Sequence, residues 1–561
     1  MTASLILPPA LPLFVGAVGL AFARGWLRST IMLVAPLVAL LLVCGVPDTN
    51  ASIGTYLGYD LLLVRGDRLS RWFGAIFAFI AFAGGLFALK QESRLEVAAA
   101  QVYAGGALGV VFAGDVLTLF AFWEVMALAS TAIIWAAGPA AQPAGMRYLL
   151  MHLFGGVLLM IGLTGEVHAS GSTAFTTMTL DSPARWLILV GFLINAGAPP
   201  LSVWLPDAYP RASYSGMVIL SAFTTKSAVF VLMLAFPGAE VLIWVGLFMV
   251  FYGIIQALLA NDLRRILAFS IINQVGVMLT GIGIGTKLAL DGAASHAFAS
   301  ILYTALMLMA AGWVAQATGR SRLTELGGLF RSMPVTTACC IIGAMTISGL
   351  PLTAGFVTKA MIGSAAASEH LVLAWYLLIA AGAGVVLYAG LRFSWFVFFQ
   401  RDSGLRPPDP PWNMRLAMLL LAALCLLFGM VPDILYVFLP FGSTYSPYSV
   451  AHVVSQVQIV LFSTVAFVLM AGALRPRATI TLDADWIYRR FGMTLWRWTS
   501  HAIWTLWYLT SLAAWTLMVQ TLTEVSQVVR QGFLSERQAS STMAIFAVGM
   551  LAFYLAVLLF L

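Results

Sequence analysis

Long apolar segments separated by short polar loops run along the whole 561-residue chain. A transmembrane helix needs about 20 mostly apolar residues, and segments of that kind recur from end to end. Runs of this length are typical of helices and exclude a barrel, so the pattern predicts an all-α polytopic membrane protein. It places about sixteen spans, at approximately 4–23, 29–46, 72–90, 96–113, 115–137, 147–168, 185–200, 215–236, 240–259, 265–286, 293–316, 334–368 as one discontinuous unit, 371–399, 414–431, 451–474 and 541–561.

Glycine and proline interrupt this pattern at two places. The first is NAGAPPLSVWLP at 195–206, and the second is Gly349-Leu350-Pro351, which divides 334–350 from 352–368. Proline removes a backbone donor and frees carbonyl groups that can bind a cation or water. Breaks at corresponding places in two halves of a chain predict inverted repeats, with ion sites where the helices break. An ordinary proline kink is the alternative for either segment.

Composition and charge support the membrane assignment. Of the residues, 61% are hydrophobic and 9% are charged, whereas soluble domains carry about 25% charged residues. The net charge of +7 does not indicate a nucleic-acid partner, because the basic residues lie in loops after alternate spans. The positive-inside rule then puts these loops in the cytoplasm and the N-terminus outside, in a bacterial inner (plasma) membrane. The basic residues are Arg24, Arg28, Lys90, Arg94, Arg147, Arg264, Arg265, Arg320, Arg322, Arg401, Arg406, Arg475 and Arg477.

The sequence lacks the patterns of a cofactor or metal site. Cys44, Cys339, Cys340 and Cys425 lie in apolar runs without CxxC spacing, which favours packing in the core. There is no nucleotide-binding loop and no Ser/His/Asp set. We therefore expect no cofactor and no metal. Whether the assembly is an enzyme stays open, and we expect any redox chemistry to lie on partner subunits.

Three ionisable side chains stand inside apolar segments. They are Glu124 in FAFWEVMALAS, Lys226 in SAFTTKSAVFVL and Lys359 after the second break. An ionisable group at membrane depth costs several kcal/mol unless it is paired or hydrated, so these residues indicate proton or cation transport. For Lys359, the alternative is a side chain that extends to the membrane interface.

The end of the chain has a different pattern. From Asp485 to about Glu536, tryptophans and tyrosines alternate with arginines and a histidine, a mixture that suits the headgroup region of a membrane. Together with an apolar anchor at 541–561, this predicts a long interfacial helix that lies as a strap along the membrane or neighbouring proteins. One more span near 502–520 is the alternative.

Five stretches resemble the antiporter-like subunits shared by respiratory complex I, Mrp-type cation/proton antiporters and membrane-bound hydrogenases. They are GDVLTLFAFWEVMALAS, PLSVWLPDAYPRASYSGMVILSAFTTKSAVFVL, NDLRRILAFSIINQVGVML, SHAFASILYTALMLMAAG and LGGLFRSMPVTTACCIIGAMTISGLPLTAGFVTKAMI. The last of these resembles the D-type branch of the Mrp subunits, whereas the strap and anchor resemble the distal complex I subunit. The resemblance covers about residues 96–400. It implies a fourteen-helix core of two inverted five-helix repeats, each with one broken helix.

This resemblance suggests a division of the chain into six parts. We expect N-terminal transmembrane helices, a first and a second antiporter-like repeat, C-terminal core helices, an amphipathic lateral helix and an anchor helix. The corresponding ranges are 1–95, 96–236, 237–400, 401–474, 475–540 and 541–561.

The family carries protons along a midplane chain of buried Glu, Lys and His residues. The resemblance assigns four such positions here: Glu124, Lys226, His296 and Lys359. Asn195 stands where most relatives have the lysine that pairs with the glutamate. Glu124 therefore lacks its usual cation, and we expect it to be protonated or paired elsewhere.

The row that begins at His296 is also altered. Where relatives continue with histidine and lysine, this chain has Ser300 and Thr304. The spacing of four residues keeps all three on one helical face. Hydroxyl groups can hold waters, but they cannot store a proton at neutral pH.

The sequence thus favours a subunit that moves protons, and with them Na⁺ or another cation, in a Mrp-type or complex I-like assembly. Its expected partners are other hydrophobic subunits and lipid. Altered or partial conduction is one alternative. The other is a structural subunit whose path is interrupted at Asn195, Ser300 and Thr304, within a redox or inorganic-carbon uptake complex.

Overall fold

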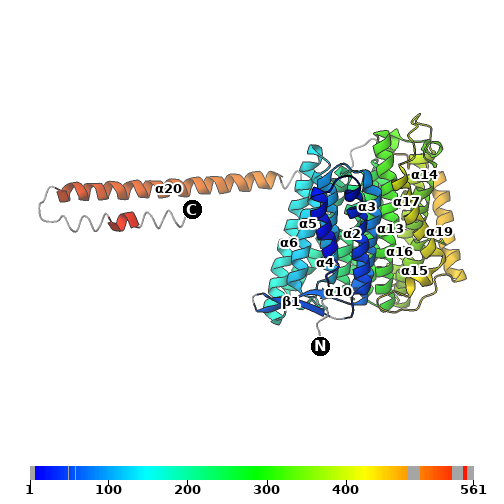
Figure 1. Cartoon of the computed structure of the whole chain (residues 1–561), viewed down its shortest axis with the longest axis horizontal. Coiled ribbons are helices and arrows are strands. Elements are labelled where there is room, and N and C mark those ends of the chain that lie inside the picture. Colours follow the sequence, from blue (N-terminus) through cyan, green and yellow to red (C-terminus); the bar gives the residue numbers. More distant parts are fainter. Residues whose placement is uncertain (1–6, 49, 57, 478–492, 534–546, 552–561) are drawn as a thin grey trace. The chain divides into compact units, whose positions relative to one another are not determined.

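The computed structural model describes residues 7–48, 50–56, 58–477, 493–533 and 547–551. The chain forms two compact units, Met1–Asp483 and Ala484–Leu561. The first unit is a bundle of helices that stand side by side, with a small β-hairpin at its lower end in Figure 1. The prediction of a helical, polytopic membrane protein is confirmed.

The helices of the first unit follow one another through short loops. The first six are α1 (Leu11–Phe22), α2 (Gly25–Gly45), α3 (Arg68–Phe87), α4 (Arg94–Phe112), α5 (Val116–Trp135) and α6 (Gln142–Ser170). The middle group is α7 (Pro183–Ala196), α8 (Trp204–Ala208), α9 (Gly216–Ala222), α10 (Thr224–Ala235), α11 (Val241–Leu259), α12 (Leu263–Ile284) and α13 (Lys287–Thr318). The last group is α14 (Pro334–Ile347), α15 (Ala354–Ser368), α16 (Val372–Val385), the π-helical segments η7 (Val386–Phe393) and η8 (Trp395–Phe399), α17 (Trp412–Met430), α18 (Pro432–Tyr436) and α19 (Val450–Leu469).

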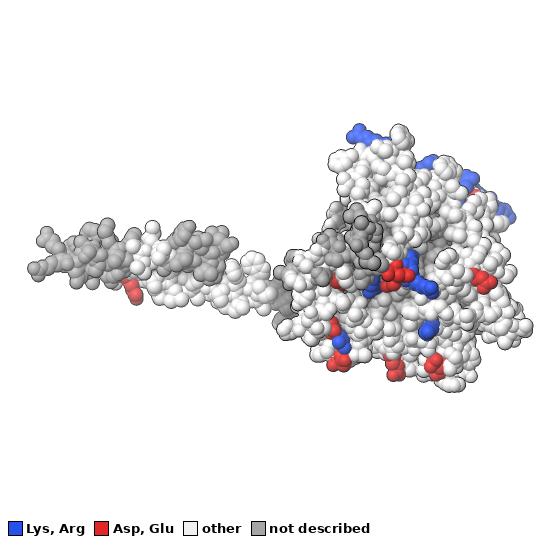
Figure 2. Space-filling model, turned by 60° about the horizontal axis from the view of Figure 1, so that its bottom comes forward, with Lys and Arg blue, Asp and Glu red and all other residues white. Residues whose placement is uncertain are grey.

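Length and composition define the membrane spans. Within the described residues, 14 helical segments are at least 18 residues long and apolar enough to cross a membrane. Two shorter apolar helices, α1 and α14, accompany them. The predicted anchor span 541–561 lies outside the described residues except for 547–551. Figure 2 shows the matching surface, in which charged side chains gather towards the two ends of the bundle with an uncharged band between them.

A β-hairpin follows α2, in a segment where the sequence predicted only a loop. Strands β1 (Asn50–Tyr56) and β2 (Tyr59–Arg65) pair antiparallel. The amide of Leu62 donates to a carboxylate oxygen of Asp115 (2.8 Å), and the Leu62 carbonyl accepts from Gly114 (2.8 Å). Arg65 donates to the carbonyl of Phe175 (3.3 Å). The hairpin therefore joins the turn between α4 and α5 to the loop between α6 and α7.

Both predicted helix breaks are present. The first lies between α7 and α8, where Gly197 adopts a left-handed conformation (φ 80°) directly after Ala196. The second lies between α14 and α15, where Gly349 has φ 71°. Glycine adopts such angles without the steric cost that a Cβ imposes, so each helix stops at its break and resumes after a few residues.

Backbone segments approach closely around the second break. A Cβ on Gly355 would lie 1.8 Å from the carbonyl oxygen of Thr346. A Cβ on Gly429 of α17 would lie 2.3 Å from the Cα of Thr353. Only glycine fits at either position, so α14, α15 and α17 hold the break in one conformation.

The cysteine prediction holds for three of four residues. Cys339, Cys340 and Cys425 are buried in the core. Cys44 is exposed, because it lies near the end of α2, an outer helix whose span is 28% buried. Its assignment to the core was wrong.

The second unit contains α20 (Met493–Phe533), one continuous helix of 41 residues. At 1.5 Å per residue it is about 60 Å long, roughly twice the hydrocarbon thickness of a bilayer. Its stretch Arg497–Gln527 is apolar enough to cross a membrane, and the tryptophans at 498, 504, 507 and 515 are exposed. Length and composition are therefore compatible with the strap and with the additional span.

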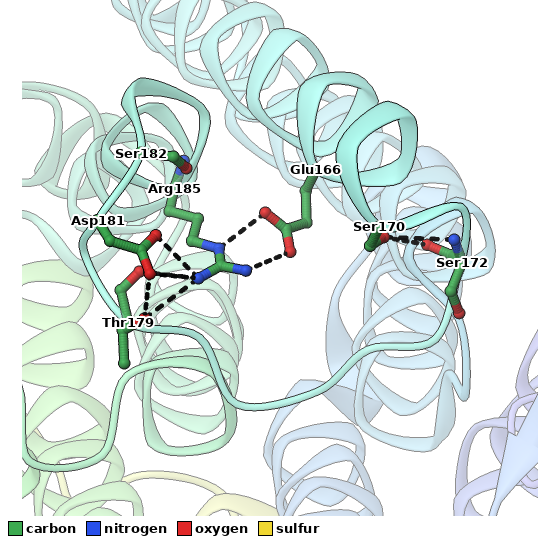
Figure 3. A network of polar contacts seen from close by, with 7 residues as sticks. All are labelled: Glu166, Ser170, Ser172, Thr179, Asp181, Ser182 and Arg185. Atoms are coloured by element: carbon green, nitrogen blue, oxygen red, sulfur yellow. Dashed lines mark hydrogen bonds and ion pairs between the residues drawn. The ribbon is translucent and has the colours of Figure 1, made fainter.

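Arg185 at the start of α7 binds the end of α6 and the connecting loop (Figure 3). Its guanidinium meets both carboxylate oxygens of Glu166, at 2.8 and 2.9 Å, and donates to Asp181 at 2.9 Å. The hydroxyl of Thr179 donates to Asp181, which lowers the pKa of that carboxyl below 3.8. The stabilisation from Asp181 is therefore complete at neutral pH, and it is lost as the pH falls below that value through the lower, folded-state pKa.

We expect Arg185→Ala to lower the stability of the assembled protein by about 1–2 kcal/mol, because it removes a two-point, partly buried ion pair. Arg185→Lys should recover part of the loss, since it keeps the charge without the planar fork. The midpoint of thermal unfolding of the purified complex measures both changes. Arg320→Ala, which removes a looser and more exposed pair with Glu325 (3.5 Å), is the matched control. Equal midpoints for all three variants would contradict the role of Arg185.

Candidate functional site

The site residues predicted from the sequence lie on four different helices. Glu124 is on α5, Lys226 on α10, His296 on α13 and Lys359 on α15. His296 lies close to the Lys359 segment of α15, because its Nδ1 is 3.1 Å from the hydroxyl of Thr358, the residue before Lys359.

Lys226 follows a kink at Phe223, where α9 ends and α10 begins. It is 1% exposed, and its ammonium donates to the carbonyl of Ser221 at 3.0 Å. Among the described residues, Lys226 makes no ion pair. A lysine held by a carbonyl alone, without a carboxylate, can release its proton more easily than a paired one.

Lys359 lies one turn after the second break. Its ammonium donates to the carbonyl of Ile347 (2.5 Å), at the end of α14. The break frees this carbonyl from the helix, so the local fold supplies the acceptor. The side chain is directed to the break, and this contact does not support the interfacial alternative.

A cavity of about 440 Å³ adjoins Lys359 between α12, α15, α16 and α19. Its polar lining includes Asn273, Ser348, His452 and Gln456. Cavities of this size with several polar partners hold water. Lys359 is therefore positioned to exchange protons with a small group of waters.

His296 joins this cavity to the protein interior. Its Nε2 donates to Oε1 of Gln274 (3.1 Å), and its Nδ1 lies 3.1 Å from the hydroxyl of Thr358. The side-chain amide nitrogen of Gln274 donates to Oδ1 of Asn273 (2.5 Å), and Asn273 lines the cavity beside Lys359. The hydroxyl of Tyr303 also donates to Gln274 (3.0 Å). The result is a continuous polar row from α13 through α12 to the cavity.

Glu124 stands apart from this row. Its Oε1 has no hydrogen-bond partner among the described residues and faces Gly156 on α6, where a Cβ would lie 2.2 Å away. Arg147, near the start of α6, binds Asp207 through two hydrogen bonds of 2.7 and 3.0 Å.

The three altered positions lie in the buried interior. Asn195, at the end of α7, bonds to the imidazole of His152 on α6. Ser300 donates to the carbonyl of Ala297 in its own helix (2.9 Å), and Thr304 is 4% exposed. The polar row therefore passes from His296 on α13 to Gln274 on α12 and does not continue along α13 to Ser300 and Thr304.

Sequence reasoning missed several residues of this site. Asn273 and Gln274 stand in the middle of α12, whose span is fully buried, and His152 stands in the middle of α6. Polar side chains in such segments are costly, so each was visible as a signal. The fold was needed to show that Gln274 meets His296 and that His152 meets Asn195.

Another carboxylate, the buried Glu96, lies at the end of the bundle that carries the basic loops. It accepts hydrogen bonds from Ser213 (2.7 Å), Ser215 (2.6 Å) and Gln91 (3.0 Å). A cavity of about 390 Å³, lined also by Arg211, adjoins it. Sequence reasoning missed Glu96 because it stands in the first turn of α4, where a carboxylate is ordinary. Among the described residues, no group of three His, Cys, Asp or Glu side chains could hold a metal ion.

Comparison with known proteins identifies the family. Residues 113–384 match the family described as "NADH:quinone oxidoreductase/Mrp antiporter, TM". The A/B subunit of a probable K(+)/H(+) antiporter of Rhizobium meliloti is 29% identical over 67% of this chain and 41% of its own length. The D subunit of the Na(+)/H(+) antiporter of Alkalihalophilus pseudofirmus is 27% identical over 66% of this chain and 82% of its own length. The chain spans about half the length of the first curated relatives that it matches.

A solved structure supports the same fold over nearly the whole chain. A chain of the membrane-bound sulfane sulfur reductase, an archaeal respiratory membrane complex, superposes with a TM-score of 0.72 at 22% identity. The match covers 98% of this chain and 100% of that chain. Residues 113–384 of this chain therefore match the antiporter-like membrane subunit family shared by Mrp antiporters and NADH:quinone oxidoreductase, and the fold extends over nearly the whole chain.

Proposed function

We propose that this chain is the proton- or cation-translocating subunit of a multisubunit Mrp-type or complex I-like membrane assembly. The observation that carries this proposal is a pair of lysines, the buried Lys226 and the partly buried Lys359, each next to a kink or break and each held by a backbone carbonyl. His296 lies within electrostatic reach of both. Buried lysines without carboxylates are costly, and a transport role explains why the chain keeps two.

The proton path that we propose runs through the polar row. A proton on Lys226 passes towards His296, and Gln274 and Thr358 orient the imidazole between the two lysines. Lys359 then exchanges with waters in the 440 Å³ cavity. Because the charge of each group acts on the next, a proton that leaves one lysine favours protonation of the histidine.

The altered positions favour a second candidate, a subunit that supports assembly while its path is interrupted. Ser300 bonds within its own helix and cannot relay a proton in that rotamer. Glu124 has an unpartnered buried oxygen and no cation beside it. The route through Gln274 bypasses Ser300, and for this reason we favour conduction.

The test is cation-driven proton movement in inverted membrane vesicles that contain the intact native complex. We expect Lys359→Ala to reduce the rate about tenfold, a change of about 1.4 kcal/mol in the activation free energy. We expect water in the adjoining cavity to occupy part of the space left by the lysine side chain and to carry protons there, which limits the loss of transport rate. Lys287→Ala, at the start of α13, is the control for a lysine outside the row. An unchanged rate in a fully assembled Lys359→Ala complex would contradict conduction through this residue and would favour the second candidate, a subunit that supports assembly.

Glu124→Gln should have a small effect, less than about threefold on the same rate, because the amide resembles a protonated carboxyl in size and polarity. The infrared band of a protonated carboxyl, sensitive to deuterium exchange, should be present in the wild type and absent from Glu124→Gln. A wild type without this band would show that Glu124 is ionised.

Membrane orientation and partners complete the proposal. We infer that the basic loops face the cytoplasm and that the N-terminus and β-hairpin face outside, in accordance with the positive-inside rule. The partners are other hydrophobic subunits of the same complex. We also propose that α20 lies along the membrane or these subunits, because about 60 Å exceeds a single crossing. Cysteine cross-linking from Trp498 and Trp515 to neighbouring subunits tests that placement.

A further inference from the structure

We propose that His152 is a proton-binding site that connects the Glu124 side of α6 with α10. This inference rests on the proposed function and adds to it a carrier that neither the sequence nor the comparisons assign. Its starting point is a buried imidazole with one free nitrogen beside a small cavity.

The hydrogen bonds fix the protonation state of the neutral ring. Asn195 donates through its amide nitrogen to the carbonyl of Gly191 (3.3 Å), so its Oδ1 faces His152. An amide oxygen can only accept, so Nδ1 of His152 carries the hydrogen. Nε2 is then a bare acceptor, and it has no hydrogen-bond partner among the described residues.

The free nitrogen has room for a proton carrier. His152 is 3% exposed, and a cavity of about 10 Å³ adjoins it. This volume suits about one water molecule. The lining consists of Trp123, Met126, Ala127, His152, Asn195 and Thr224. A water bonded to Nε2 would therefore have the Thr224 hydroxyl and the Asn195 amide as its other polar neighbours.

The position of His152 joins two parts of the site. On α6, Gly156 lies one turn beyond His152 and faces the carboxyl of Glu124. The Glu124 carboxyl and the His152 imidazole therefore lie along the same face of α6. Across the cavity, Thr224 precedes Lys226 by two residues on α10. The imidazole thus stands between the carboxyl on α5 and the start of α10, the helix that carries Lys226.

The surroundings also decide how the charged ring is tolerated. The rings of Tyr148 and Trp204 pack against it, with centroids at 4.1 and 4.6 Å. The carboxylate of Asp207 on α8 is bound to Arg147, and Glu124 has no cation beside it. With no carboxylate bonded to the ring, an imidazolium here is short-lived, which suits a carrier better than a store.

The step itself is simple. The Nε2 lone pair accepts one proton to form imidazolium, Nδ1–H stays bonded to Asn195, and the same Nε2–H later releases the proton into the cavity. Uptake and release therefore use one nitrogen. Between the two events, the cavity water changes the group to which it is hydrogen-bonded.

The experiment compares His152→Asn with His168→Asn in the vesicle assay with the intact complex. The amide nitrogen of asparagine can keep the contact with Asn195 but cannot be protonated, so assembly should be normal and proton movement should fall at least about tenfold. His168, near the exposed end of the same helix, is the matched control, and its variant should move protons at the wild-type rate.

Each outcome bears on one proposal. Wild-type transport in His152→Asn, with Lys226→Ala inactive, would overturn the role of His152 and leave the proposed function intact. Wild-type transport in all these variants would overturn the proposed function as well. If His152→Asn does not assemble, nitrogen-15 NMR of histidine-labelled wild type decides. A buried histidine with Nδ1 protonated at every pH and Nε2 that takes up a proton as the pH is lowered supports the proposal, and an Nε2 without a proton throughout overturns it.

Discussion

The Lys226→Ala variant is expected to move protons at less than about one hundredth of the wild-type rate, a loss of about 2.7 kcal/mol in transition-state stabilisation. Lys226 is the one ionisable residue of α9 and α10. It is 1% exposed and does not line the 440 Å³ cavity that adjoins Lys359, so we expect water to replace it less well than it replaces Lys359. The measurement is the initial rate of cation-driven acidification in vesicles with the intact complex.

The adjacent Ser227 supplies the control for this experiment. Its buried hydroxyl has no hydrogen-bond partner among the described residues, so Ser227→Ala removes a polar group at the same depth without removing a bond. We expect wild-type transport from it. If Lys226→Ala and Ser227→Ala transport equally well, protons do not pass through α10.

A comparably large effect is expected from Gly355→Ala at the second break. The added Cβ would lie 1.8 Å from the carbonyl oxygen of Thr346, backbone against backbone, with no flexible side chain to move aside. The break must then open, which moves α15 and the Lys359 ammonium away from Ile347. We expect a loss of stability of about 3 kcal/mol or more, measured as the thermal midpoint and as the amount of assembled complex on native gels.

Gly363→Ala is the matched substitution in the same helix. A Cβ there meets no atom within 4 Å, and alanine favours helix over glycine by about 1 kcal/mol. This variant should be as stable as the wild type or more so. Equal destabilisation of both variants would mean that α15 tolerates no added methyl group, and the close approach at Thr346 would not be the cause.

The sequence was a good guide to the helices and to the two helix breaks. The span predicted at 115–137 corresponds to α5 (Val116–Trp135), because the length of an apolar run is set by the membrane. The two breaks were visible because glycine and proline act locally. The start of α13 at Lys287, before the predicted 293, shows that helix ends in polar surroundings are less well marked.

The missed features share a physical cause. The hairpin depends on Leu62 meeting Asp115, and the imidazole of His152 depends on Asn195, 43 residues further along the chain. Such contacts depend on which helix faces pack against each other. A single sequence shows the face on which a residue lies, but not the helix that packs against that face. The proton row through Gln274 was missed for the same reason, since the sequence pointed to Ser300 and Thr304 on the helix of His296.

The hairpin also has a consequence for how the chain is made. Its strands are complete at Arg65, but the Asp115 carboxylate and the Phe175 carbonyl that hold it are synthesised later. The helices α3 and α4 must be made before the first of these contacts can form, and the second must wait for α6. The hairpin therefore links the α4–α5 turn to the α6–α7 loop while the chain is still being made. Asn195 and Lys226 are synthesised later and pack against helices that these contacts already hold.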